Sequence, residues 1–165
     1  MKEIKLTIDG KEVQLTDEQL EVIGIIEKEK NPFKRAYYGA KYFCILEFDN
    51  VASYCDCKDI EADAFFESVN YFSTQPFAQQ VALHQLLYRK LLKFSYDNEC
   101  EDTEWNGNNI HAYIIYSSTK KDYDIRWTRD EKEPGTVYFK SSIWATAALN
   151  EVVMPFVKEH PDFVW

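Results

Sequence analysis

The feature of this sequence that most constrains its fold is a segment that occurs twice. Residues 70–78 align with residues 137–145 at an offset of 67 residues, and in both copies a Tyr-Phe pair precedes a hydroxyl side chain that can cap a helix. Upstream, residues 42–46 resemble residues 112–116 at an offset of 70. Two amphipathic helix starts can look alike by chance, but the matching upstream strands favour a duplication. The repeat therefore predicts two related units, each with the order strand, strand, strand, helix.

The first unit has the composition of a small antiparallel sheet followed by a long helix. Aromatic and β-branched residues predict strands at 41–48, 51–57 and 69–72. Between the second and third strands we expect a loop with a short helical turn at 62–66. Apolar residues at helical spacing then predict a long helix over about 75–96.

The second unit repeats this order with a shorter helix. Strands are predicted at 112–116, 123–127 and 137–139, with a Pro-Gly turn before the third strand. Either Ser141 or Ser142 can cap the helix that follows.

The end of the second helix is marked by Pro155. A proline inside a helix removes a backbone donor, so we expect the helix to kink or end near Val152. The residues after it are too apolar for a free tail, and we expect Phe163 and Trp165 to dock against the protein.

The N-terminal residues predict a hairpin and a helix. Asp9-Gly10 lies between two alternating apolar runs, which is a strong signal for a β-hairpin. Thr16 and Gln19 have the spacing of a capping box, which predicts a helix over 17–30.

Together these elements predict an α+β fold with antiparallel sheets and helices packed on one face. We expect an N-terminal hairpin and helix in residues 1–35, a first ββ(β)α unit in 36–104 and a second in 105–165. A chain of 165 residues with 45% hydrophobic and 28% charged side chains is expected to form one compact fold.

Targeting features are not visible in the sequence. Charged residues interrupt the first ten positions, and no stretch has the roughly 20 apolar residues that would span a bilayer. Four cysteines are too few for a disulfide scaffold. We therefore expect a protein with reduced thiols in the cytoplasm of its cell, with no membrane partner.

Negative charge is concentrated in the middle of the chain. The net charge is −9, and residues 41–104 alone contain twelve acidic and five basic side chains. Such charge repels phosphate backbones, which argues against direct nucleic-acid binding and favours a basic protein as partner. Solvated loops that keep the chain in solution are the alternative. The predicted partner-binding residues are Asp56, Asp59, Glu61, Asp63, Glu67, Asp97, Glu99, Glu101, Asp102, Glu104 and Trp105.

The cysteines offer a weak metal hypothesis. Cys55 and Cys57 form a C-x-C pair that could make a zinc site with Cys44 and Cys100, but zinc sites usually have two close pairs. On a strand, Cys55 and Cys57 would point to one face, as core residues do.

No motif predicts catalysis. The three histidines lack triad or ligand spacing, and glycine-rich phosphate loops are absent from the sequence. The acidic residues around Lys132 could imitate a metal-dependent nuclease cluster; they are Asp122, Asp124, Glu131 and Glu133. We predict no catalytic, cofactor-binding or metal-binding residues.

Several segments resemble one group of proteins. They are residues 3–13 and 15–20, the two helix starts after Tyr71-Phe72 and Tyr138-Phe139, and residues 155–165. These segments are similar to small accessory proteins encoded by phages and mobile elements of gut bacteria. The resemblance concerns the scaffold and implies no particular activity.

The predicted function is that of a non-enzymatic accessory protein of phage or mobile-element origin. It would bind a basic host or phage protein through an acidic and aromatic surface. One specific form is an inhibitor that occupies the nucleic-acid groove of a host defence protein by imitating phosphate charge. The alternatives are a virion or assembly component, including a homo-oligomer that pairs sheet edges, and a small metal-dependent hydrolase.

Overall fold

The computed structural model describes residues 6–8, 11–13, 31–46 and 50–165. Strands β1 (Leu6–Ile8) and β2 (Lys11–Val13) pair antiparallel with Ile8 opposite Lys11, which confirms the predicted hairpin. The capping box and the helix predicted over 17–30 lie outside the described residues.

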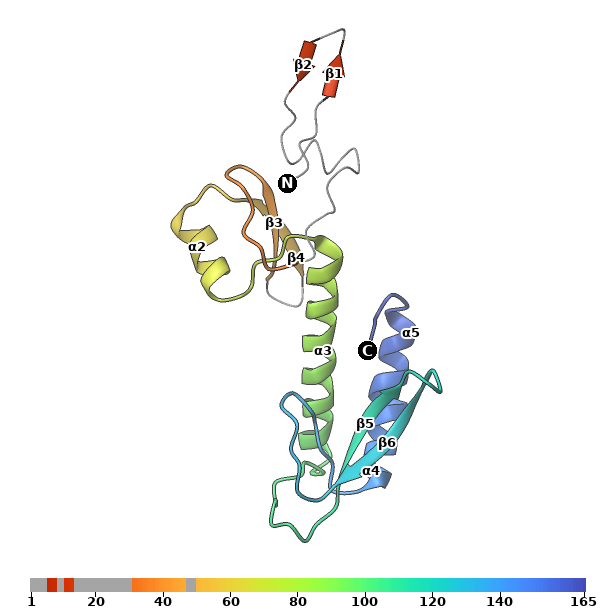
Figure 1. Ribbon diagram of the computed structural model, residues 1–165. Helices are drawn as coiled ribbons and strands as arrows, with labels where there is room; N and C mark the ends of the chain where they lie inside the picture. The colour runs from red at the N-terminus through yellow and green to blue at the C-terminus, as the bar shows by residue number, and fades with distance from the viewer. Residues whose placement is uncertain (1–5, 9–10, 14–30, 47–49) are drawn as a thin grey trace.

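The first unit contains one hairpin and two helices (Figure 1). Strands β3 (Lys41–Ile45) and β4 (Val51–Cys55) pair antiparallel, and α3 (Gln75–Asp97) follows as predicted. The short helical turn predicted in the loop is a full helix, α2 (Ile60–Glu67). The carboxylate of Asp59 caps α2 by accepting a hydrogen bond from the backbone N of Ala62, 2.9 Å away.

The second unit has a hairpin and a composite helix. Strands β5 (His111–Ser117) and β6 (Asp122–Thr128) pair antiparallel. The helix consists of α4 (Ser142–Ala148), a π-helical turn η2 (Leu149–Val153) and α5 (Met154–Glu159).

We expected Pro155 to kink or end the helix near Val152. The helix does not end there, so that alternative is wrong, but its α-helical geometry is interrupted by the π-helical turn η2. The π-helical turn lies immediately before α5, so Pro155 falls in the first turn of α5, where a missing N–H costs little. The helix therefore continues to Glu159.

The two units share the same backbone geometry at their third predicted strand. In place of each predicted third strand the structure has isolated β-bridges. Phe72 pairs with Phe43, and Phe139 pairs with both Ala112 and Glu101. The paired N···O distances are 2.8 Å in both directions for Phe43 and Phe72, and 3.0 and 2.8 Å for Ala112 and Phe139. The fold is thus α+β, with two ββα arrangements.

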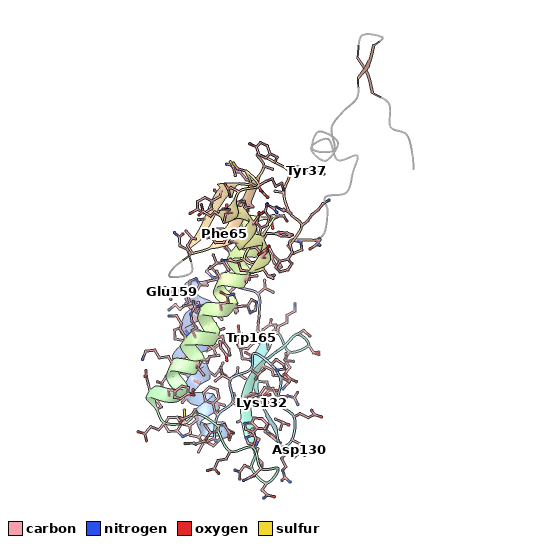
Figure 2. The ribbon with its side chains drawn as sticks, turned by 90° about the vertical axis from the view of Figure 1, so that its left-hand side faces the viewer. Tyr37, Phe65, Asp130, Lys132, Glu159 and Trp165 are labelled. Atoms are coloured by element: carbon pink, nitrogen blue, oxygen red, sulfur yellow. The ribbon has the colours of Figure 1, made fainter. Side chains whose placement is uncertain are left out.

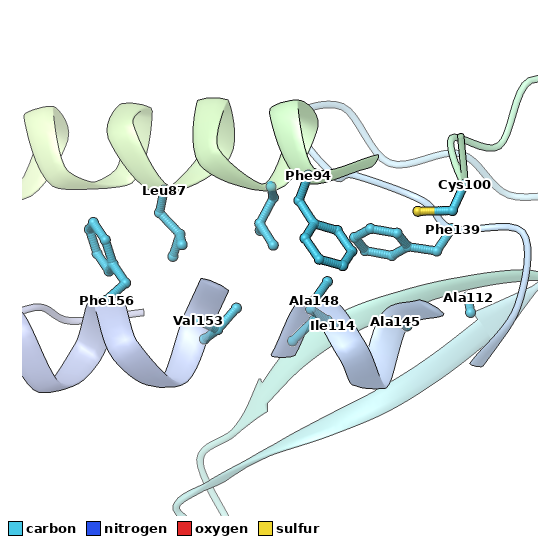
Figure 3. Close-up of a cluster of buried hydrophobic side chains, with 11 residues drawn as sticks. Leu87, Phe94, Cys100, Ala112, Ile114, Phe139, Ala145, Ala148, Val153 and Phe156 are labelled. Carbon is cyan, nitrogen blue, oxygen red and sulfur yellow. The ribbon is translucent and has the colours of Figure 1, made fainter. Parts of the chain in front are cut away.

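Each unit has its own core. In the second unit, one face of β5 and β6 packs against the composite helix and the second half of α3 (Figure 3). Its buried residues are Leu87, Leu91, Phe94, Cys100, Ala112, Ile114, Phe139, Ala145, Ala148, Val153 and Phe156. The first unit has a smaller core of Tyr42, Cys44, Ala62 and Tyr71, in which the rings of Tyr42 and Tyr71 stack 4.2 Å apart.

The C-terminal residues dock as predicted. Phe163 packs against the second core, and the ring of Trp165 contacts that of Tyr123 at 5.2 Å. The side chain of Gln80 on α3 also fixes this segment: its Oε1 accepts from Val164 N at 2.9 Å, and its Nε2 donates to Asp162 O at 2.8 Å.

Helix α3 connects the two units. Its N-terminal end lies against β3 and β4, and its C-terminal half covers the second core (Figure 1). A helix of 23 residues is about 35 Å long. Features that sit at its two ends are therefore far apart on the surface.

Candidate protein-binding surface

The predicted partner-binding acids form two blocks, 56–67 and 97–104, which lie at opposite ends of α3. The first block begins directly after β4 and includes α2, beside the start of α3, whereas the second block begins at the last residue of α3 (Figure 1). The predicted residues therefore do not form one continuous surface.

Asp56 is a buried structural residue. Its side chain is fully buried, and its two oxygens accept hydrogen bonds from Arg35 Nε at 2.9 Å, Lys58 N at 2.8 Å and the Tyr71 hydroxyl at 2.9 Å. The guanidinium of Arg35, more than any other group, holds the pKa of this carboxyl well below its usual range. Asp56 is engaged inside the fold and has no carboxylate oxygen to offer a partner.

The remaining acids of the first block differ in exposure. Arg35 also pairs with Asp63 at 2.6 Å, and Asp59 caps α2 while staying exposed. Glu61 and Glu67 are exposed on α2, and neither carboxylate makes an ion pair within the described parts of the chain.

The second acidic block is partly structural as well. Asp97 pairs with Lys93 one turn earlier on α3, and the nearly buried Asp102 pairs with Nδ1 of the buried His111. Glu101 is half-buried, whereas Glu99 and Glu104 are exposed. Sequence spacing gave no signal for the Asp102–His111 pair, because the bridge of Phe139 to both neighbouring segments brings these residues together.

Trp105 is also held by contacts within the second unit. Its ring stacks on the His111 ring with centroids 3.7 Å apart and meets Tyr138 edge-on at 4.9 Å. The ammonium of Lys132 lies over the Trp105 ring at 5.4 Å. The half-buried ring therefore anchors the connector between α3 and β5, and its free area is small.

Sequence reasoning missed a set of exposed apolar residues next to the first acidic block. Tyr37, Tyr38 and Ile60 are 58%, 74% and 89% exposed. Backbone hydrogen bonds hold the Tyr37-Tyr38 turn against the residues that precede α2: Gly39 N donates to Asp56 O at 2.8 Å, and Asp56 N donates to Ala40 O at 2.9 Å. Gly39 has a φ of 79° and makes the turn that exposes both tyrosines. This glycine, directly after the two tyrosines, was the one sequence signal for the exposed turn.

We call Tyr37, Tyr38, Asp59, Ile60 and Glu61 the aromatic-acidic end. Figure 2 shows Tyr37 at the far end of the first unit, with Asp130 and Lys132 at the opposite end of the molecule. Two neighbouring cations, Arg35 and Lys58, are occupied by Asp56. Among the described residues, neither cation makes an ion pair with Asp59 or Glu61.

Two of the four cysteines differ from the prediction in their exposure to solvent. Cys55 and Cys57 are exposed, so the prediction that they face a core is wrong, whereas Cys44 and Cys100 are buried. Strand β4 is the outer strand of its hairpin, which leaves Cys55 in solvent. Burial raises the pKa of both buried thiols. All four cysteines are free.

Neither metal cluster considered from the sequence is assembled among the described residues. No group of three or more His, Cys, Asp or Glu side chains gathers there as ligands of one ion. Of the acids near Lys132, Asp124 is paired with Lys120 at 2.9 Å.

Comparison with known proteins adds no relative. No protein-family model, curated protein or solved structure matches this chain. In the described residues, no helix is both long and apolar enough to cross a membrane.

Proposed function

We propose that this chain is a non-enzymatic, protein-binding accessory protein of phage or mobile-element origin, and that its partner is a basic protein. The sequence resemblance supports the origin. The observation that supports binding is the aromatic-acidic end, where Tyr37, Tyr38 and Ile60 are exposed and the turn of the two tyrosines is hydrogen-bonded to the segment that leads into α2. Exposed apolar residues gathered at one place are typical of protein-interaction sites.

The chemistry of the aromatic-acidic end fits lysine and arginine side chains. The faces of Tyr37 and Tyr38 can receive a cation, and the carboxylates of Asp59 and Glu61 can pair with it. A nucleic-acid-binding protein presents such cations in its phosphate-binding groove. Occupying that groove would make this chain an acidic inhibitor of a host defence or nucleic-acid-binding protein.

An affinity capture experiment tests this proposal. The tagged protein is incubated with lysate of a bacterial host at low and at high salt, and the partner is identified, purified and titrated. We expect one stoichiometric basic protein that is lost at high salt. The double variant Tyr37→Ala/Tyr38→Ala, or Glu61→Lys, should weaken binding of the purified partner at least tenfold, or about 1.4 kcal/mol.

Matched variants at the other end of α3 provide the control. Glu99→Lys/Glu104→Lys changes exposed acids of the second block and should leave affinity within about twofold, because the two blocks lie at opposite ends of α3, a helix about 35 Å long. A partner whose affinity responds only to the Glu99 and Glu104 substitutions would contradict the proposed surface.

A second candidate function is self-association in a virion or assembly. Within the described residues, β4 pairs only with β3, and Ser53, Tyr54 and Cys55 on it are exposed. An unpaired outer strand can pair with the same strand of a second copy. A mass that rises with concentration in sedimentation, with no partner captured at either salt, would favour this candidate.

A further inference from the structure

The second unit contains a pocket that the proposed binding surface does not use. It has a volume of about 280 Å³ and lies between α3, β5 and the segment 133–137. Its floor is the apolar core, formed by Leu87, Leu91, Ile114 and Phe139. The pocket is therefore built on rigid, buried side chains.

Aromatic rings form the walls of this pocket. Tyr88 and His84 come from α3, Tyr113 comes from β5, and Trp165 comes from the docked C-terminal segment. Tyr113 is fixed by the ring of Tyr138, 5.3 Å away. Tyr88 and Trp165 are 40% and 36% exposed, so their rings are accessible to a ligand.

One carboxylate completes the lining. Glu133 is held at the rim because its backbone N donates to the Tyr138 hydroxyl at 2.8 Å. Its carboxylate has no ion pair or hydrogen bond within the described residues. Burial, and then the charge of Glu133, raise the pKa of Tyr113, in agreement with a carboxylate close to that phenol.

Positive charge is missing from the pocket itself. None of its lining residues in the described chain is a lysine or an arginine. Arg126 lies opposite Tyr113 on the neighbouring strand but does not line the pocket, and its Nε lies 4.0 Å from a carboxylate oxygen of Asp124. Aromatic walls with one unpaired carboxylate are the features that recognise organic ammonium groups through cation–π attraction.

We propose that this pocket binds an alkylammonium group, with Tyr88, Tyr113 and Trp165 around the cation and Glu133 as its counter-charge. The site goes beyond the proposed function, because it lies on the second unit and does not involve the aromatic-acidic end. The ammonium can belong to a free amine or to a lysine side chain.

Choline and its uncharged carbon isostere, 3,3-dimethylbutan-1-ol, test the proposal on the full-length protein. Binding is followed by Trp165 and Tyr113 chemical shifts in NMR titrations. We expect choline to bind at least tenfold more tightly than the isostere. Equal affinity for both compounds, or no shift with choline at any concentration used, would overturn the proposal.

Two variants and one matched control locate the site. Glu133→Gln should weaken choline binding about tenfold while leaving the isostere unchanged, and Tyr88→Leu should also weaken choline. Glu131→Gln changes a nearby exposed acid outside the pocket and should weaken choline binding by less than about twofold. Loss of choline binding in Glu131→Gln, with Glu133→Gln unaffected, would contradict the assignment.

A second titration distinguishes the two sources of the cation. N-acetyl-lysine methylamide and its trimethyl-lysine form are compared with choline on the same protein. Tighter binding of either lysine compound identifies a protein side chain as the ligand, and tighter binding of choline identifies a free amine. Because these titrations need no captured protein, they test the pocket even if the aromatic-acidic end binds nothing.

Discussion

Asp56 is the residue on which the geometry of the first unit depends most. Arg35, Lys58 and Tyr71 all donate to its buried carboxylate, and Lys58 Nζ also donates to Ala36 O at 2.8 Å. These contacts connect the turn before β3 with the segment that enters α2. The aromatic-acidic end is therefore positioned by one buried negative charge.

Replacing Asp56 with Asn should destabilise the protein by about 3 kcal/mol, because it leaves Arg35 and Lys58 without their shared counter-charge. Urea denaturation at pH 7 measures the free energy of unfolding. Asp63→Asn is the matched control, since its side chain is 50% exposed, and it should cost less than about 1 kcal/mol. Similar losses in the two variants would contradict the role given to Asp56.

The stability difference between wild type and Asp56→Asn should depend on pH. The pKa of Asp56 is lowered by folding, so its contribution is complete above the unfolded-state pKa of about 3.9 and is lost as pH falls below that value. The difference between the two proteins should shrink between about pH 4 and pH 2. A difference that stays constant over this range would show that the charge of Asp56 is not its source.

At the scale of elements, the C-terminal segment closes the second core. Phe163 is half-buried against that core, whereas the neighbouring Val164 is 67% exposed. Phe163→Ala should therefore destabilise the protein by about 2 kcal/mol, and Val164→Ala by less than about 0.5 kcal/mol. Thermal unfolding of the two variants makes the comparison, and equal melting temperatures would contradict docking of this segment.

Sequence patterns predicted the elements whose signal is local. The spacing of apolar residues was sufficient to predict α3, and the alternation of apolar and polar residues was sufficient to predict β3 to β6. The apolar character of residues 160–165 predicted that this segment docks against the protein. The third strands were overestimated, because Phe72 and Phe139 each make backbone bridges without extending into a ladder. The cap of α2 had a signal that the prediction did not use, because Asp59 is a preferred N-cap residue. The π-helical turn before Pro155 has no distinct sequence signal.

The candidate surface was less predictable than the fold, because exposure depends on partners distant in sequence. Asp56 and Glu61 are both acids of the first block, and the sequence does not distinguish them. Only Asp56 is buried, because its carboxylate pairs with Arg35, which lies 21 residues earlier in the chain. Asp102 is paired in the same way by His111. Charge counting therefore located two acidic segments without separating the structural acids from the exposed ones, and their role in binding stays a prediction.

At the scale of the whole molecule, α3 keeps the two acidic blocks apart. The aromatic-acidic end lies on the first unit, and the ammonium pocket lies on the second, beside the other half of the helix (Figures 1 and 2). One partner the size of a small domain can cover the aromatic-acidic end without reaching residues 97–104. We therefore expect the partner to bind at the first unit.

Hydrogen exchange of the protein with and without its captured partner tests this placement of the binding surface. We expect slower amide exchange at residues 37–40 and 57–67 in the complex, with residues 97–105 unchanged. Exchange that slows at 97–105 and not at 37–40 or 57–67 would contradict it.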